Sequence, residues 1–289
     1  MKQTRSYEQA MLGRKDSEIT VFGGPQATSF AGALRDFTEG IERYSYWHSL
    51  AWNDIKTRYR RSWLGEFWMA INLAIFVLSV GTVYGVLLNM RLSNYLPQLT
   101  VGYAFWLLFS SLMIEGCQTF ILGTAVLHQQ RVPLTAFVLR NVDRAFISFA
   151  HNLAVVGIVL FVFGIRPNWS ILLFIPGLLL WWLNGMWLSF IVGILSARFR
   201  DVPQIVTNFV QILFLVSPVL WREESVPYSL RLVSRFNPLS HFLAIVRNPL
   251  LGAEVPILSW SVAGVITIAG WIAAAFLIRA YRTRVSYWI

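Results

Sequence analysis

Residues 67–88 read FWMAINLAIFVLSVGTVYGVLL and contain no charged side chain. As an α-helix, at about 1.5 Å per residue, this run is long enough to cross the ~30 Å hydrocarbon layer of a bilayer. Five further apolar runs follow, at residues 99–127, 145–165, 171–196, 205–221 and 257–280. The sequence therefore predicts an all-α, polytopic membrane protein with six transmembrane helices, in a transmembrane domain that covers residues 64–289.

The fifth run is the shortest of the six and contains Asn208, Gln211 and Pro218. A polar group without a partner costs several kcal/mol in lipid. We therefore expect the polar groups of this run to face other helices or a cavity.

The composition is typical of a protein that lies in lipid. Hydrophobic residues make up 56% of the chain and charged residues only 13%, against roughly 25% charged residues in a typical soluble domain. In a soluble protein the net charge of +10 would suggest a nucleic-acid partner. In a membrane protein the basic residues must first be assigned to a side of the membrane, and we expect no nucleic-acid partner here.

Lysine and arginine are distributed unevenly among the segments between the apolar runs. With a cytoplasmic N-terminus, eighteen of the 24 lie on the cytoplasmic side and six on the other side. Cytoplasmic loops carry the excess of basic residues in membrane proteins. The sequence therefore predicts that both termini are cytoplasmic and that the number of spans is even.

Three segments lie outside the predicted spans. Residues 1–38 are polar and contain Gly and Pro, so we expect an irregular cytoplasmic arm. Residues 39–63 carry apolar side chains at steps of three and four, which predicts an amphipathic helix on the inner membrane surface. Residues 222–256 contain four prolines, which indicates two short helices that re-enter the membrane from the periplasm, in a segment that could act as a gate.

Three blocks of sequence resemble those of a known family of transporters. They are DIKTRYRRSWLGEFW at residues 54–68, ARFRDVPQ at residues 197–204, and residues 237–252, which begin with Asn-Pro-Leu. With the six runs, they resemble the ABC-2 type polysaccharide export permeases over roughly residues 40–289. The chain is most similar to the O-antigen permeases, with the teichoic acid and capsule permeases as close relatives.

The resemblance implies a homodimer that works with two copies of a separate cytoplasmic ABC ATPase in the bacterial inner membrane. Such a complex moves a lipid-linked polysaccharide from the cytoplasm to the periplasm, and membrane lipids are its further partners. The three lysines, Lys2, Lys15 and Lys56, lie outside any Gly-x-x-x-x-Gly-Lys-Ser/Thr loop. We therefore expect a permease subunit that is not an enzyme, with no catalytic residue, metal or bound cofactor, while the partner ATPase uses ATP and Mg.

The segment before the first span contains the candidate residues for admitting the substrate. Leu64 and Gly65 form a hinge, and the resemblance implies that this hinge lies at the cytoplasmic mouth and admits the lipid-linked head, although a simple corner between helices explains it equally well. Arg58, Arg60 and Arg61 could bind the pyrophosphate of the lipid carrier, because guanidinium groups match phosphate oxygens. Anchoring to anionic headgroups is the interpretation that we favour for these arginines.

The turn between the second and third spans contains the candidate residues for ATPase coupling. Pro133 can open a short helix within residues 129–140. By resemblance, this helix would dock into the ATPase. The candidate residues are Gln129, Arg131, Pro133 and Arg140.

Aromatic side chains could line a path for a sugar polymer, because their faces stack on sugar rings, although most aromatic residues in spans simply pack. The candidates are Tyr84, Tyr103, Phe105, Trp106, Trp181, Trp182 and Trp187, with the carboxyl of Glu115. A carboxyl at span depth costs about 3 kcal/mol and normally faces the interior of the bundle. We favour a structural partner for Glu115, either Arg144 or His151, over a role in transport.

Alternative functions remain open at this point. Capsule and teichoic acid exporters share the plan of O-antigen exporters. An ion-gradient secondary transporter usually has more spans and several charges at mid-membrane. A membrane enzyme needs acidic or histidine groups that converge near an interface.

Overall fold

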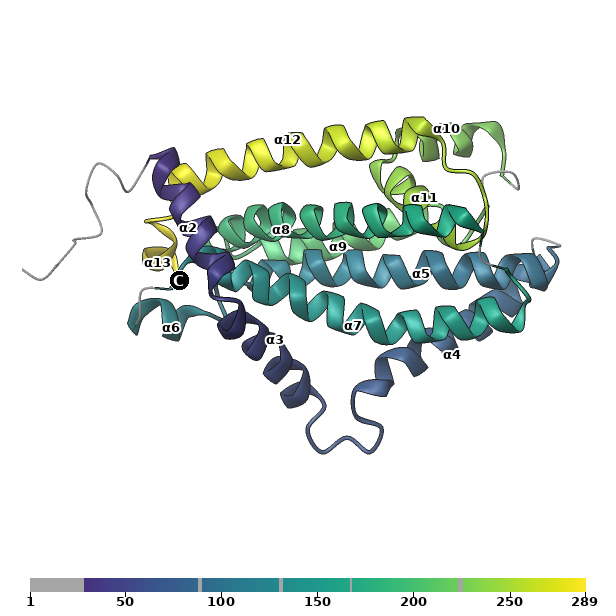
Figure 1. The fold of residues 1–289 in the computed structure, drawn as a ribbon, viewed down its shortest axis with the longest axis horizontal. Coiled ribbons are helices and arrows are strands. Elements are labelled where there is room, and N and C mark those ends of the chain that lie inside the picture. The colour runs from purple at the N-terminus through teal and green to yellow at the C-terminus, as the bar shows by residue number, and fades with distance from the viewer. Residues whose placement is uncertain (1–28, 88–89, 130–131, 167, 223–225) are drawn as a thin grey trace, which may run out of the picture.

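The computed structural model describes residues 29–87, 90–129, 132–166, 168–222 and 226–289 of the chain (Figure 1). The regular elements of these residues are all helical. The α-helices are α2 (Phe30–Glu42), α3 (Tyr44–Arg58), α4 (Trp68–Leu87), α5 (Leu92–Ile114), α6 (Thr124–Gln129), α7 (Leu134–Val162), α8 (Phe174–Arg198), α9 (Val202–Val216), α10 (Tyr228–Phe236), α11 (Pro238–Leu250), α12 (Ile257–Tyr281) and α13 (Val285–Trp288). Short 3-10 turns occur at Gly65–Phe67, Gly116–Gln118 and Trp169–Leu173.

Five of these helices, α4, α5, α7, α8 and α12, are long and apolar enough to cross a membrane. They lie side by side as a bundle, with α4 oblique to the others (Figure 1). The prediction of an all-α, polytopic membrane protein is confirmed. The six-span count is not confirmed. Helix α9, which corresponds to the fifth run, has 15 residues and is about 22 Å long, shorter than the ~30 Å hydrocarbon layer. The helix is followed by Ser217, which has an extended backbone, the conformation expected for a residue before a proline such as Pro218.

The helices formed by the second and third apolar runs have bounds that differ from those of the runs. The run predicted at 99–127 begins earlier, with α5, and is interrupted after Ile114, so that α6 is a separate short helix. The run predicted at 145–165 begins at Leu134, directly after Pro133. The short helix expected within residues 129–140 is therefore the first part of a 29-residue helix.

The N-terminal segment also differs from the prediction. The expected irregular arm lies outside the described residues up to position 28, but its end is helical, because Ser29 caps α2 by accepting a hydrogen bond from the Gly32 backbone N–H at 3.1 Å. In place of the single helix expected at 39–63, the chain forms α2 and α3, which meet at Arg43. On the predicted apolar face, Trp47, Ala51 and Ile55 are buried, whereas Ile41 and Tyr44 are exposed. The position of this segment on the inner membrane surface stays a prediction.

Helix α2 lies across one end of the bundle, where α6 and α13 also lie (Figure 1). We call this the terminal end, and the end near α10 and α11 the opposite end. The Arg282 guanidinium donates a hydrogen bond to the backbone carbonyl of Gly32. The Arg279 guanidinium lies 4.5 Å from the ring centroid of Phe30. Helix α2 is thereby held to the last turns of α12.

Asp36 of α2 caps the N-terminus of α7. Its carboxylate accepts hydrogen bonds from the backbone N–H groups of Leu134 and Thr135 at 3.0 and 3.1 Å, and from the Thr135 hydroxyl at 2.7 Å. Pro133, the residue at the N-cap position, supplies no side-chain cap. A negative charge is favourable at a helix N-terminus, where backbone donors lack partners. Asp36 thus fixes α2 against the first turn of α7.

Helix α5 occupies the centre of the core. Its buried side chains include Tyr95, Leu99, Phe105 and Leu108. It contacts α4, α7, α8, α9 and α11. The packing of α4 on α5 is close at Gly81, where an added Cβ would lie 2.3 Å from a methyl carbon of Leu96. Small residues allow this close approach between membrane helices.

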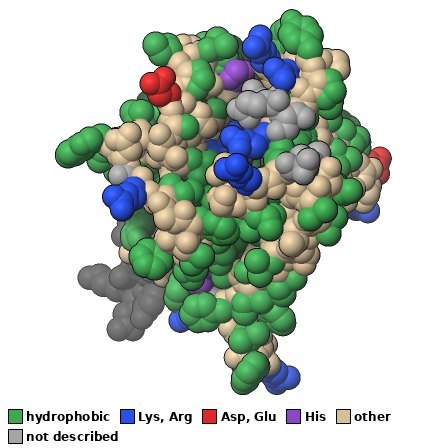
Figure 2. Space-filling model, turned by 90° about the vertical axis from the view of Figure 1, so that its right-hand side faces the viewer, with side chains coloured by type: hydrophobic (Ala, Val, Ile, Leu, Met, Phe, Trp, Pro, Cys, Tyr) green, Lys and Arg blue, Asp and Glu red, His purple; other side chains and the backbone are tan. Residues whose placement is uncertain are grey.

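The two short helices predicted within residues 222–256 are present as α10 and α11 at the opposite end, and their position in a membrane stays a prediction. Arg247 of α11 donates a hydrogen bond to the Pro218 carbonyl at 2.7 Å, and Asn237 donates one to the Ser217 hydroxyl at 2.8 Å. These bonds hold α11 against the end of α9. Figure 2 shows the surface at this end, where arginine side chains are scattered among apolar groups.

Substitution of Gly40 should loosen the contact between α2 and α7. An added Cβ would lie 2.5 Å from the Cβ of Thr135, a side chain that is buried and held by Asp36. We expect Gly40→Ala to lower the free energy of unfolding by about 1–3 kcal/mol, as overpacking does. Thermal unfolding in detergent measures the change. The control is Gly157→Ala in α7, where the added Cβ meets no atom within 4 Å, and equal midpoints for the two variants would contradict the prediction.

Candidate functional site

A chain of alternating charges connects α3 to α5 and α7. Asp54 of α3 accepts hydrogen bonds from the Arg140 guanidinium at 2.6 and 2.8 Å and from Arg144 at 3.1 Å. Glu115, at the end of α5, lies 2.8 Å from Arg144 and 3.0 Å from Arg58. We call these five residues the charge network.

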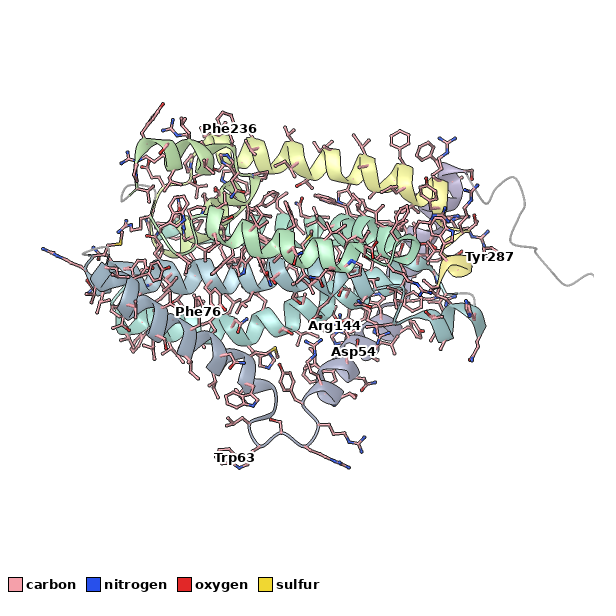
Figure 3. The ribbon with its side chains drawn as sticks, turned by 180° about the vertical axis from the view of Figure 1, so that it is seen from behind. Asp54, Trp63, Phe76, Arg144, Phe236 and Tyr287 are labelled. Atoms are coloured by element: carbon pink, nitrogen blue, oxygen red, sulfur yellow. The ribbon has the colours of Figure 1, made fainter. Side chains whose placement is uncertain are left out.

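Apart from Arg58, whose side chain is 46% exposed, the charge network is partly or fully buried. The side chain of Arg144 is 8% exposed and that of Asp54 is 21% exposed. Arg144 also donates a hydrogen bond to the Asn141 side chain at 2.9 Å, and Asn141 donates one to the Ser189 hydroxyl of α8 at 2.9 Å. Figure 3 shows Asp54 and Arg144 side by side between α3 and the bundle. Because partly buried charges are costly unless paired, the charge network fixes the position of α3 on the bundle.

The ion pair between Glu115 and Arg144 confirms the structural partner that the sequence suggested. His151, the other candidate, forms a hydrogen bond with the Ile147 carbonyl of its own helix at 2.9 Å. Glu115 lies at the C-cap of α5, at the edge of the span. It therefore avoids most of the cost expected for a carboxyl at mid-membrane.

Arg58 is held by the charge network as well. Burial acts to lower the pKa of its guanidinium and is the largest single effect, but the charge and hydrogen bond of Glu115, with smaller effects of Tyr59 and Asp54, together outweigh it, so that the pKa lies above its ordinary value. Arg58 therefore stays charged and turns toward Glu115. The structure separates it from Arg60 and Arg61, with which the sequence had grouped it.

Arg60, Arg61, Leu64 and Gly65 lie together on the loop between α3 and α4. This loop projects from the bundle, and Trp63 at its tip is 96% exposed (Figure 3). The backbone is left-handed at Gly65, with φ of 56°, and at Arg61, with φ of 69°. This region suits glycine but is strained for a residue with a side chain. The loop therefore has a defined shape, and its contact with a substrate stays a prediction.

The residues proposed for ATPase coupling do not form one surface. Gln129 is the exposed last residue of α6, and Arg131 lies outside the described residues. Pro133 is buried beneath α2, and Arg140 is bound by Asp54. Among the described residues of this group, Gln129 on α6 is thus the exposed one. Helix α6 contacts α13 through a hydrogen bond between His128 and the Ser286 carbonyl at 3.0 Å.

The seven candidate lining aromatics are also dispersed. Phe105 and Trp181 are buried in the bundle with ring centroids 5.3 Å apart, and Trp106 is 6% exposed. Tyr103 stacks on Phe76, with ring centroids 3.7 Å apart. The first three therefore pack inside the chain, which was the alternative interpretation for such residues. A lining role stays a prediction for all seven residues.

Helix α9 carries three exposed amide side chains, two of which, Asn208 and Gln211, stand out in the sequence of the fifth run. Gln204, Asn208 and Gln211 are all exposed, and the Gln204 amide donates a hydrogen bond to Asn208 at 3.1 Å. Their spacing of four and three residues places them on one face of the helix, while Val206 and Val210 on another face are buried. We call these three residues the amide stripe. Its signal in the sequence was the helical spacing of amides within an apolar run.

Removal of the Asp54 charge should release α3 from the bundle. Asp54→Asn leaves two arginines facing a neutral side chain, and we expect a loss of about 1–3 kcal/mol in the free energy of unfolding, less than for a fully buried pair. Hydrogen exchange should rise across α3. The control is Glu39→Gln, which removes an exposed partner of Arg35 and should change stability by less than about 0.5 kcal/mol. Unchanged exchange in α3 of the Asp54 variant would contradict a fixing role.

Comparisons with known proteins give the family of the chain. Residues 46–251 match the family model described as ABC-2 type transporter. Two O-antigen export system permease proteins RfbA of Klebsiella pneumoniae are similar: one is 25% identical over 68% of this chain and 76% of its own length, and the other is 23% identical over 76% and 84%. An RfbA of Myxococcus xanthus is 25% identical over 60% of this chain and 66% of its own length. The chain belongs to the ABC-2 type transporter family of membrane proteins.

Proposed function

We propose that this chain is the membrane-spanning subunit of an ATP-driven exporter of a lipid-linked polysaccharide, O-antigen in the first instance. The exporter carries the polymer from the cytoplasm to the periplasm across the bacterial inner membrane. The family supports a transporter subunit, and the names of three relatives support O-antigen as the cargo. Capsule polysaccharide and teichoic acid are the alternatives on the same plan.

The amide stripe of α9 is the observation that carries this proposal. Its three amides are exposed on the single chain, on a helix with a mostly apolar sequence. Apart from the hydrogen bond between Gln204 and Asn208, no partner of these amides is seen among the described residues, and amide groups without partners are strongly disfavoured in hydrocarbon. The stripe must therefore face water or a second protein surface, and it offers both donors and acceptors to the hydroxyl groups of a sugar chain.

Helix α4 carries exposed polar side chains as well. Asn72 and Ser79 are exposed on it, seven residues apart and hence on one face. Helices α4 and α9 both pack on α5, and the ring centroids of Phe76 and Phe214 lie 6.3 Å apart between them. We propose that α4 and α9 of two copies face each other in a homodimer, with the polar path for the polymer between them.

The terminal end of the bundle faces the cytoplasm in this proposal, together with both chain termini. The excess of lysine and arginine in the segments at this end supports the orientation. Helix α6 lies at this end (Figure 1) and connects the spans α5 and α7 in sequence. It is a short helix with exposed positions, which can fit a groove in an ATPase. Two ATPase copies bind ATP and Mg and supply the energy.

Co-purification with an ABC ATPase tests this assignment. The full chain, solubilised mildly, should form a complex of two permease and two ATPase copies whose ATP turnover responds to lipid-linked glycan. Ala125→Trp with Gln129→Trp enlarges two exposed positions of α6 and should abolish the complex. Ser229→Trp, at an exposed position of α10, is the control and should leave the complex intact. A chain that binds no ATPase and responds to an ion gradient would instead be a secondary transporter.

The polar path has a separate test in cells. Asn208→Leu with Gln211→Leu removes two amides from the stripe, and we expect surface O-antigen to fall at least about tenfold, since each lost hydrogen bond is worth about 1 kcal/mol. The complex with the ATPase should persist. Ser261→Leu, at an exposed position of α12, should export normally. Normal export by the α9 variant at equal membrane levels would place the path elsewhere.

A further inference from the structure

A pocket of about 380 Å³ opens at the terminal end, where the last turns of α8 and α12 meet α13. Its apolar part is formed by Ile194, Leu195 and Leu277, which lie in the last turns of α8 and α12. Its rim carries two arginines, Arg198 and Arg284, and three aromatic residues. The aromatic residues are Phe199, Tyr281 and Trp288. We call this site the arginine pocket.

No carboxylate is among the residues that line the arginine pocket. Within the part of the chain that the structure describes, neither Arg198 nor Arg284 forms an ion pair, and both are exposed. The Arg198 guanidinium instead lies 5.0 Å from the ring centroid of Trp288. Arg144 of the charge network, in contrast, is neutralised by two carboxylates. The arginine pocket therefore offers positive charge that the described residues leave uncompensated.

The arginine pocket lies at the level where a membrane span ends. Arg198 is the last residue of α8, and Tyr281 is the last residue of α12. Both helices are long and apolar enough to cross a membrane. Tyr and Trp are enriched at the level of lipid headgroups. The rim is thus at headgroup height and the apolar part of the pocket is at the height of the acyl chains.

We propose that the arginine pocket binds an anionic phospholipid of the adjacent leaflet. The guanidinium groups of Arg198 and Arg284 would hold the headgroup phosphate, whose oxygens match their planar donors. An acyl chain would lie against Leu195 and Leu277. The apolar part of the pocket and its position at the end of two spans favour a lipid over an acidic protein segment. The bound lipid joins α13, which contacts α6, to the two spans.

Native mass spectrometry of the delipidated full chain tests this proposal. Titration with phosphatidylglycerol should give one tightly bound lipid per chain, and phosphatidylcholine should bind at least about tenfold more weakly, because it carries no net charge. Arg198→Gln with Arg284→Gln should weaken phosphatidylglycerol binding at least about tenfold, since hydrogen bonds to charged groups are strong. Arg198→Lys with Arg284→Lys keeps the charge and should retain most of the binding.

The matched control removes two other exposed arginines, through Arg43→Gln with Arg200→Gln. It changes the net charge equally and should leave the tight lipid in place. Equal losses in the two glutamine variants would overturn the proposal in favour of general surface attraction. Unchanged lipid binding by the pocket variant would overturn it as well, and a simultaneous loss of ATPase binding would assign the arginine pocket to that partner. Size-exclusion profiles that match the wild type show that each variant is folded.

Discussion

The carboxylate of Asp54 lies against the guanidinium groups of both Arg140 and Arg144, and the position of α3 on the bundle depends on this contact. It brings α3 to the bundle at the point where α5 ends and α7 passes. With α3 fixed, the loop from residue 59 to residue 67 must project from the bundle before α4 begins, so that Trp63 and its neighbours lie clear of the spans (Figure 3). A membrane-edge setting strengthens such a network, because water competes less for its charges than at an open surface.

The bundle separates two kinds of surface. Around α5, aromatic and aliphatic side chains are buried as in a soluble core, and the rings of Phe105 and Trp181 belong to this interior. Helices α4 and α9 instead leave amides and hydroxyls exposed beside α5. The proposed path for a polymer thus lies outside the core of each chain. A second copy would be needed to enclose it, in keeping with a transporter whose cargo is a long chain that slides and is never fully buried in one subunit.

The hydropathy of the sequence was sufficient to predict α4, α8 and α12, because these spans are bounded by charges or prolines close in sequence. It failed where distant residues decide the outcome. Helix α7 continues through Arg140 and Arg144, since α3 and α5 supply their counter-charges. Helix α5 ends at Glu115 within a run that stays apolar, since the next turn packs at Gly116 against Val192 of α8. Arg144, the partner of Glu115, was one of the two predicted partners. The burial of the aromatic candidates could not be predicted, because it depends on packing between helices that no local pattern encodes.

The position of α2 has a consequence for the order of events during synthesis. This helix is made before any span, yet its Asp36 must await the first turn of α7, which follows it by 98 residues. Its Gly32 carbonyl is bound by Arg282, which follows it by 250 residues. Until the ribosome has released nearly the whole chain, α2 therefore has no complete docking site. Its amphipathic sequence is suited to the membrane surface until that site is complete.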